Sequence, residues 1–132
     1  MNVIMLSPGY PAEMAFFSQA LAAAGATVIG IGDQPPQAVP HNAHEAMAHY
    51  VHVGSLADEG AVAATVRAVA RHVPIDRVEC LWEPYMMLAA RLREGLGLPG
   101  LTAEQTVPFR DKERMKELLG AAAHTPATVS AL

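Results

Sequence analysis

Near the start of the chain lies Val3-Ile4-Met5-Leu6-Ser7-Pro8-Gly9-Tyr10-Pro11, the stretch that decides the fold. Its first four residues are apolar and predict a short buried strand, which the Ser-Pro-Gly sequence closes. Pro11 can occupy the first turn of a helix that runs to about residue 24. Gly25 is placed to end that helix. The stretch therefore predicts a strand–loop–helix unit.

Three further apolar runs predict strands of the same sheet. Residues 27–31 form a β-branched run, residues 50–53 follow a polar, histidine-rich connection, and residues 77–82 make a fourth run. A short fifth strand is expected near residues 98–101. Each run is separated from the next by a connection long enough to cross over to a parallel neighbour.

Helical patterns fill the connections between these strands. Ser55 is expected to cap a helix whose valines at 62, 66 and 69 share one face until Pro74 ends it. The Glu83-Pro84 pair should begin a helix that continues to Gly95. Residues 102–105, Thr-Ala-Glu-Gln, have the spacing of a capping box and predict a short helix before Pro108. A last helix is expected over residues 112–122.

This alternation predicts an α/β domain. Strands joined by helices form a parallel sheet with right-handed crossovers, so we expect a three-layer, Rossmann-like sheet of four to five strands in the order 3-2-1-4. Residues 1–122 form this domain, and residues 123–132 begin a further element. No repeat or linker divides the chain.

Composition narrows the class of protein. The 132 residues are 52% hydrophobic and 17% charged, which fits one compact domain with a core. A net charge of −4 argues against nucleic acid as a partner. The N-terminus has neither a basic leader region nor a run long enough to span a membrane. The single cysteine, Cys80, is expected to be a small buried residue, and it fits a reducing, cytoplasmic location.

Ligands of an open parallel sheet bind beyond the carboxyl ends of its strands. Residues 7–10, 32–33 and 54–55 should therefore share a crevice with Glu83. Ser7, Gly9 and Tyr10 offer a hydroxyl and backbone amides for an anionic group of a substrate. Glu83 follows a hydrophobic strand and can accept a hydrogen bond from a substrate amine or hydroxyl. Helix capping by Glu83 is an equal alternative.

Two other kinds of site are excluded by spacing. A dinucleotide fingerprint needs three glycines in the first loop, where only Gly9 is present, so Asp33 does not indicate a nicotinamide or flavin enzyme. Residues 41–52 hold four of the six histidines. His44 and His49 are five apart and would diverge on a helix, which favours a loop of solvated histidines over a metal site.

Basic charge is concentrated near the C-terminus. Residues 108–119 hold both lysines, Lys112 and Lys116, and four of the nine Lys and Arg residues. From charge alone, a solvated helix face with compensating glutamates is the simpler interpretation.

A series of motifs over residues 83–126 favours a functional role for these basic residues over a solvated helix face. They are Glu83, the Leu-Gly-Leu-Pro-Gly run at 96–100, Asp111-Lys112, Met115-Lys116, Leu118-Leu119 and Thr125-Pro126. Together they resemble the N-terminal region of ATP-grasp ligases, the superfamily of biotin carboxylase, carbamoyl-phosphate synthase and D-alanine ligase. The likeness extends over most of the chain. One departure is visible, because these enzymes commonly have Ala-Gly-Ile or a similar run before Thr-Pro. This chain has Ala122-Ala123-His124 there and lacks the helix-ending glycine.

The resemblance implies a pre-ATP-grasp domain over residues 1–122 and the start of a truncated ATP-grasp lobe over residues 123–132. It implies a longer enzyme that uses ATP and Mg²⁺ to activate a carboxylate as an acyl phosphate and couple it to an amine, with small-molecule carboxylates or amines as partners. Lys112 is then the candidate ATP-phosphate ligand. Mg²⁺ ligands and most ATP contacts are expected beyond Leu132, so this chain by itself should be inactive.

Two alternatives remain at this point. The run at residues 3–14 also resembles the opening of the acceptor domain of GT-B glycosyltransferases, although that likeness covers only one strand–loop–helix unit. A noncatalytic Rossmann-like binding module is the other alternative. A homodimer is a further expectation, because apolar surface that other lobes would cover is exposed in an isolated domain.

Overall fold

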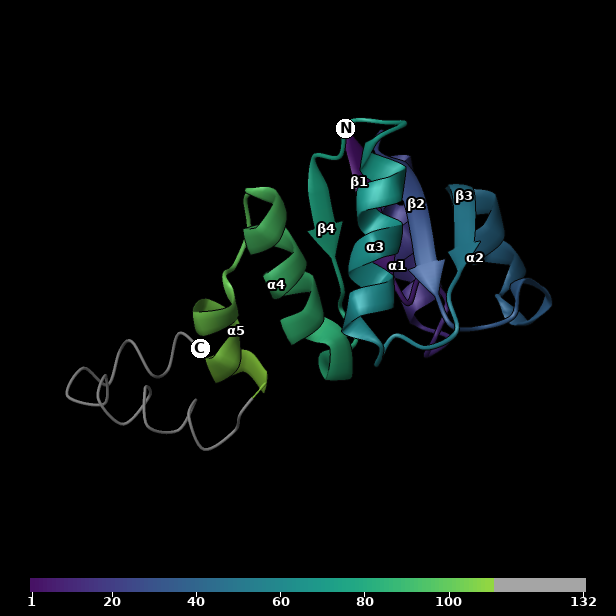
Figure 1. Ribbon diagram of the computed structural model, residues 1–132. Helices are drawn as coiled ribbons and strands as arrows, with labels where there is room; N and C mark the ends of the chain where they lie inside the picture. Colours follow the sequence, from purple (N-terminus) through teal and green to yellow (C-terminus); the bar gives the residue numbers. More distant parts are fainter. Residues whose placement is uncertain (111–132) are drawn as a thin grey trace, which may run out of the picture.

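The computed structural model describes residues 1–110. Four strands form one sheet in the order β3-β2-β1-β4, and every neighbouring pair is parallel (Figure 1). The predicted strand order is therefore confirmed. The strands are β1 (Asn2–Leu6), β2 (Thr27–Gly32), β3 (Met47–His52) and β4 (Arg77–Glu79).

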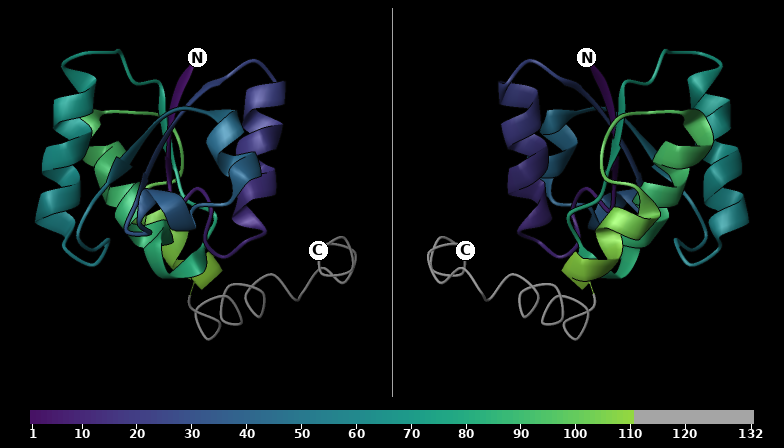
Figure 2. Two further views of the ribbon diagram at one scale, coloured as in Figure 1. Left: turned by 90° about the vertical axis from the view of Figure 1, so that its right-hand side faces the viewer. Right: turned by 90° about the vertical axis from the view of Figure 1, so that its left-hand side faces the viewer.

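Helices cover both faces of this sheet, which gives the expected three layers. Figure 2 shows α1 and α2 on one side of the strands and α3 and α4 on the other, with α5 beside α4. The helices are α1 (Met14–Ala23), α2 (His41–Ala46), α3 (Glu59–Ala70), α4 (Met86–Leu96) and α5 (Ala103–Arg110), with short 3-10 turns η1 (Pro36–Ala38) and η2 (Glu83–Tyr85).

The larger core lies between the sheet and the layer of α3 and α4. Alternate residues of the strands, such as Ile4, Leu6 and Ile31, pack there against Val62 and Leu88. The core between the sheet and the layer of α1 and α2 is smaller. A side chain at Gly30 would place its Cβ 2.2 Å from Met47 Sδ and 2.8 Å from Pro8 Cγ, so the glycine makes room for the loop above the sheet.

The first loop is longer than the sequence pattern predicted. Helix α1 begins at Met14 and not at Pro11, because residues 7–13 fold as bends and turns at the end of β1. The predicted stop is confirmed, since Gly25 follows the helix with a φ of 98°.

Helix α3 is capped by a different residue from the one predicted. Ser55 lies in the preceding turn, where its Oγ accepts a hydrogen bond from the amide of Ala57 at 3.1 Å. The N-cap is Asp58, whose carboxylate accepts from the amide of Ala61 at 3.1 Å. The prediction for Ser55 was wrong because two polar residues stood close together and only the later one adjoins the helix.

The predicted helix after β4 is divided and ends later than Gly95. Glu83 and Pro84 form the 3-10 turn η2, and α4 then runs to Leu96. Gly97 ends it with a φ of 67°, a left-handed conformation that glycine adopts without strain. Gly95 lies inside the helix.

No fifth strand occurs among residues 1–110, and β4 is three residues long, not six. Arg93 explains both differences. This residue is 6% exposed, and its guanidinium donates to the carbonyl of Val78 at 2.8 Å and to the carbonyl of Leu101 at 3.0 Å and 2.7 Å. The guanidinium thus bridges β4 and the segment that was predicted to pair with the sheet.

The capping box of α5 is confirmed. The amide of Gln105 donates to Thr102 Oγ1 at 3.1 Å, and the amide of Thr102 donates to Gln105 Oε1 at 3.0 Å. The helix continues through Pro108 to Arg110, past the predicted stop.

Two further expectations concern the histidine-rich connection and the last helix. Residues 41–52 are not a solvated loop, because they form α2 and β3. The helix predicted over residues 112–122 lies outside the described residues.

Candidate functional site

The carboxyl ends of all four strands lie at one edge of the sheet because the strands are parallel. Two of the loops that leave this edge touch through aromatic rings. The ring centroids of Tyr10, after β1, and Trp82, after β4, are 5.0 Å apart at an interplanar angle of 79°. Trp82 is in turn 5.3 Å from Tyr85 of η2. These three residues form an aromatic cluster, whose edge-to-face geometry is the favourable one for such rings.

The loop after β1 is held by its own contacts. Ser7 has a φ of 52°, is buried, and donates its hydroxyl hydrogen to the carbonyl of Tyr10. A Cβ on Gly9 would lie 2.7 Å from Pro40 Cδ, so this glycine packs against the segment before α2. Ser7 and Gly9 thereby set the shape of the loop, while Tyr10 is 50% exposed.

Polar groups after β2 and β3 are also joined to one another. Asp33 Oδ2 accepts from the amide of Leu56 at 3.1 Å, which ties the two strand ends together. The Tyr50 hydroxyl donates to the carbonyl of Gln34 at 2.7 Å. Burial, and next the charge of Asp33, raises the pKa of Tyr50 to about 12. The hydrogen bonds at the carboxyl ends of β2 and β3 therefore hold the fold together.

Glu83 lies beside the aromatic cluster, in the 3-10 turn that leads into α4. Its side chain is exposed at the carboxyl edge. The sequence prediction that Ser7, Tyr10 and Glu83 follow neighbouring strands is consistent with this geometry, since β1 and β4 pair directly. Their binding roles stay predictions.

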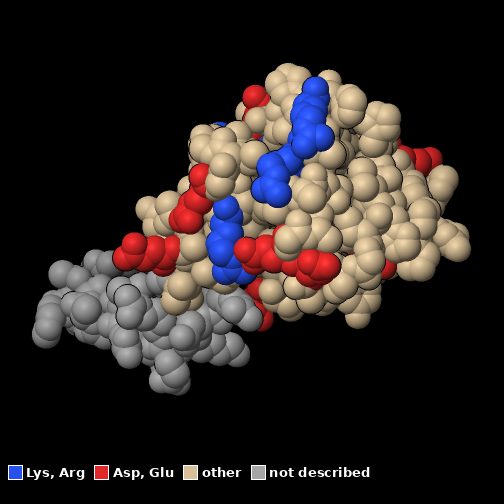
Figure 3. Space-filling model, in the orientation of Figure 1, with Lys and Arg blue, Asp and Glu red and all other residues tan. Residues whose placement is uncertain are grey.

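A hollow of about 260 Å³ opens next to Tyr85, between the start of α3 and the η2–α4 segment. An ion pair crosses its rim, with Arg91 Nη2 2.6 Å from Glu59 Oε1. Figure 3 shows acidic and basic side chains in contact on this α3–α4 side of the molecule. The residues that line the hollow are Leu56, Ala57, Glu59, Pro84, Tyr85, Met87, Leu88 and Arg91.

Sequence reasoning missed Trp82, Tyr85 and the Glu59–Arg91 pair. The aromatic signal was present, because Trp82 ends an apolar run directly before the Glu-Pro pair. The ion pair joins residues 32 positions apart and had no local signal.

Cys80 is buried beneath this edge. Its thiol donates to the carbonyl of Trp82 at 3.4 Å, and burial raises the pKa of Cys80 to about 11. The predicted role as a small buried residue is confirmed.

The comparisons with known proteins agree with this architecture. Residues 17–100, more than half of the chain, match the ATP-grasp N-terminal domain family. The chain belongs to this family. A comparison with curated protein sequences found no match.

The structure of this ATP-grasp N-terminal domain is similar to the crystal structure of an L-amino acid ligase from Bacillus licheniformis, with a TM-score of 0.68 and 24% sequence identity. The match covers 91% of this chain and 29% of the ligase chain. It shows that the fold is shared. The chain thus spans less than a third of that protein.

The family implies ATP and Mg²⁺ in complete enzymes. Residues 1–110 of this domain contain no group of three or more His, Cys, Asp or Glu side chains placed to hold a metal ion, so they do not supply a Mg²⁺ site by themselves. The predicted phosphate ligand, Lys112, lies outside the described residues. Within those residues, no helix is both long and apolar enough to cross a membrane.

Proposed function

We propose that this chain is the substrate-side N-terminal domain of an ATP-dependent ligase that couples a carboxylate to an amine through an acyl phosphate. The observation that carries the proposal is the family match over residues 17–100. The contact between the loops after β1 and β4 supports a substrate site at the carboxyl edge. The family match favours this function over a glycosyltransferase acceptor domain.

In this proposal, Glu83 and the aromatic cluster contact different parts of the substrate. The carboxylate of Glu83 accepts hydrogen bonds from the neutral substrate amine and orients it, and the nitrogen lone pair stays free to attack the acyl phosphate. The exposed ring of Tyr10 packs against the rest of the substrate. Ser7 and Gly9 hold the loop so that Tyr10 stays beside Trp82, and the backbone amides of that loop face the substrate.

Most contacts to the nucleotide are assigned to parts of the enzyme beyond Leu132, together with the Mg²⁺ ligands. This domain contributes Lys112, which contacts an ATP phosphate. The domain extends over residues 1–122, and residues 123–132 begin the ATP-grasp lobe. A cytoplasmic location suits an enzyme that consumes ATP.

The role of Glu83 is tested in the longer ligase by Glu83→Gln. This change keeps the shape of the side chain but removes its charge. Loss of a charge-assisted hydrogen bond should raise KM for the amine substrate about tenfold or more while KM for ATP stays the same. Glu104→Gln, an exposed change in α5, is the matched control. Equal kinetics of the two variants would show that Glu83 only caps its helix.

The placement of the nucleotide is tested with the 132-residue chain. Calorimetric titration with Mg-ATP should show no binding at micromolar concentrations, and the chain should have no ATPase activity. Micromolar binding would contradict the proposed division of labour. Should the gene encode no ATP-grasp lobes after residue 132, the noncatalytic binding module would be the better interpretation.

A further inference from the structure

The aromatic cluster offers ring surface to a ligand at the carboxyl edge of the sheet. Its rings meet edge to face, so each contact joins the edge of one ring to the face of another. Tyr10 is 50% exposed, which leaves part of its ring open. The face of an aromatic ring carries negative partial charge and attracts an ammonium group that lies within about 6 Å of the ring centroid. The cluster can therefore bind an organic cation as well as an apolar group.

The charges around the cluster favour the cation. A loop leaves the carboxyl end of each strand before the next α-helix, and these loops are residues 7–13, 33–40, 53–58 and 80–85. Every loop contains one carboxylate, and none contains Lys, Arg or His. The carboxylates belong to Glu13, Asp33, Asp58 and Glu83. Charges of one sign along an edge create a potential that attracts the opposite sign, so this edge attracts positive groups.

Arg91 does not cancel this potential. It is the one basic residue among those that line the hollow beside Tyr85. Its Nε lies 2.9 Å and 3.0 Å from the two carboxylate oxygens of Glu59, which neutralise its charge. A ligand that rests on the cluster can thus extend into the hollow without meeting an unpaired positive charge there.

We propose that the aromatic cluster binds a cationic group of the amine substrate, an ammonium or methylated ammonium carried in addition to the amine that reacts. This inference rests on the proposed function, in which Glu83 orients the neutral, reacting amine. The ring of Tyr10 contacts the second group, and the carboxylates of the edge stabilise its charge. A basic amino acid such as lysine belongs to this substrate class. Norleucine has the same carbon stem without the charge and does not.

Binding of a cation can be measured without catalysis. Trp82 is the one tryptophan of the chain, so the tryptophan fluorescence of the 132-residue chain reports on the cluster. The probes are choline and its neutral carbon isostere, dimethylbutanol. Choline should change the emission with a Kd on the order of millimolar, and the isostere should bind about threefold or more weakly. Equal binding of the two probes, or no response to choline at about 100 mM, overturns the proposal.

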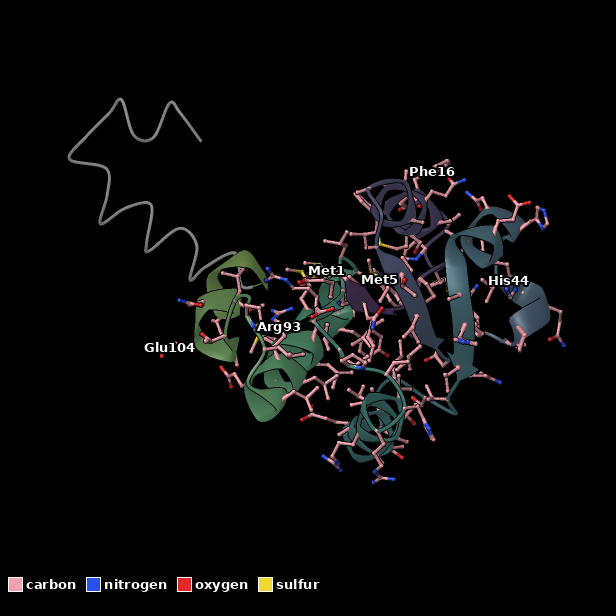
Figure 4. All side chains as sticks on the ribbon, turned by 90° about the horizontal axis from the view of Figure 1, so that it is seen from above. Met1, Met5, Phe16, His44, Arg93 and Glu104 are labelled. Atoms are coloured by element: carbon pink, nitrogen blue, oxygen red, sulfur yellow. The ribbon has the colours of Figure 1, made fainter. Side chains whose placement is uncertain are left out.

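Variants of Tyr10 show whether the ring itself binds the cation. Tyr10→Leu removes the ring and should weaken choline binding about threefold or more, whereas Tyr10→Phe keeps the ring and should bind choline within about twofold of the unchanged chain. Phe16→Leu is the matched control, because Phe16 is 65% exposed on α1 and points away from the sheet (Figure 4). It should leave choline binding unchanged. Equal losses in Tyr10→Leu and in either of the other two variants overturn the proposal.

The substrate class is tested in the longer ligase with lysine and norleucine as the amines. The unchanged enzyme should have a kcat/KM for lysine about threefold or more above that for norleucine, and Tyr10→Leu should remove this preference. A ligase that does not prefer lysine overturns the assigned substrate class. Glu83→Gln should slow both amines alike. If it changes neither, the proposed function fails, while the choline titration still decides whether the cluster binds cations.

Discussion

Arg93 shows how one side chain can replace an element of structure. Its guanidinium satisfies the outward carbonyl of Val78 on β4 and holds the carbonyl of Leu101, at the place where the sequence indicated a fifth strand. It also lies 3.3 Å from Glu79 Oε2. Planar guanidinium groups suit this task because they donate in several fixed directions at once.

Replacing Arg93 with Met should therefore destabilise the domain. The change keeps much of the apolar stem but leaves the carbonyls of Val78 and Leu101 without their donor, which should lower the free energy of unfolding by about 2–4 kcal/mol. Urea unfolding of the 132-residue chain measures the change. Arg91→Met is the control, since its exposed ion pair with Glu59 should contribute less than about 1 kcal/mol. Equal losses of unfolding free energy in both variants would show that the hydrogen bonds from Arg93 to Val78 and Leu101 do not stabilise the domain.

Cys80 should be chemically inert in the folded domain. Its pKa of about 11 leaves little thiolate at pH 8, and the side chain is buried. We expect iodoacetamide to label it at least 100-fold more slowly than free cysteine at that pH. The same chain in urea, where the burial is lost, should be labelled at the ordinary rate. Rapid labelling of the native chain would show that the edge above Cys80 opens.

At the scale of elements, the start of α3 offers a clean comparison of two polar residues. Asp58→Ala removes the side chain that accepts from Ala61, and should cost about 1 kcal/mol of stability. Ser55→Ala removes a hydrogen bond within the preceding exposed turn and should cost about half of that or less. Thermal unfolding with the two variants side by side measures both. A larger loss of stability in Ser55→Ala than in Asp58→Ala would support Ser55 as the N-cap, as the sequence predicted.

The sequence predicted the kinds of element better than their limits. Apolar runs and helical spacing identified all four strands of the described sheet and their order, because these signals are local and repeat along the chain. The limits of β4 and α4 depend on contacts between distant residues. Arg93 takes the backbone carbonyl of Val78 and so shortens β4. Helix α4 ends at Gly97, although Gly95 was an equally good candidate from the sequence.

At the scale of the whole molecule, Gly30 sets how closely the first loop approaches the sheet. Gly30→Ala would press a methyl group against Met47 and Pro8, and should lower the free energy of unfolding by about 1–3 kcal/mol. Gly95→Ala is the opposite case, because nothing lies within 4 Å of the added carbon and the site is helical. It should raise stability by up to about 1 kcal/mol. Chemical denaturation of both variants tests this contrast.

The candidate site was predicted in its location but not in its contents. Parallel strands must end at a common edge, so Tyr10 and Glu83 could be placed there from the sequence alone. The aromatic cluster depends on β1 and β4 being neighbours in the sheet. This pairing brings together Tyr10 and Trp82, which are far apart in the sequence. Side-chain contacts of this kind follow from the assembled topology and have no signal in a local stretch.

The strand order also fixes when each part of the domain can form during synthesis. The inner strand β1 emerges first and can pair with β2, which in turn can pair with β3, but β4 lies at residues 77–79 and the Arg93 bridge that holds it needs Leu101. At about 5–20 residues per second, the other side of β1 stays without its neighbour for seconds. During that interval the nascent chain presents an open row of backbone donors and acceptors, so this is when it is most vulnerable to pairing with another chain.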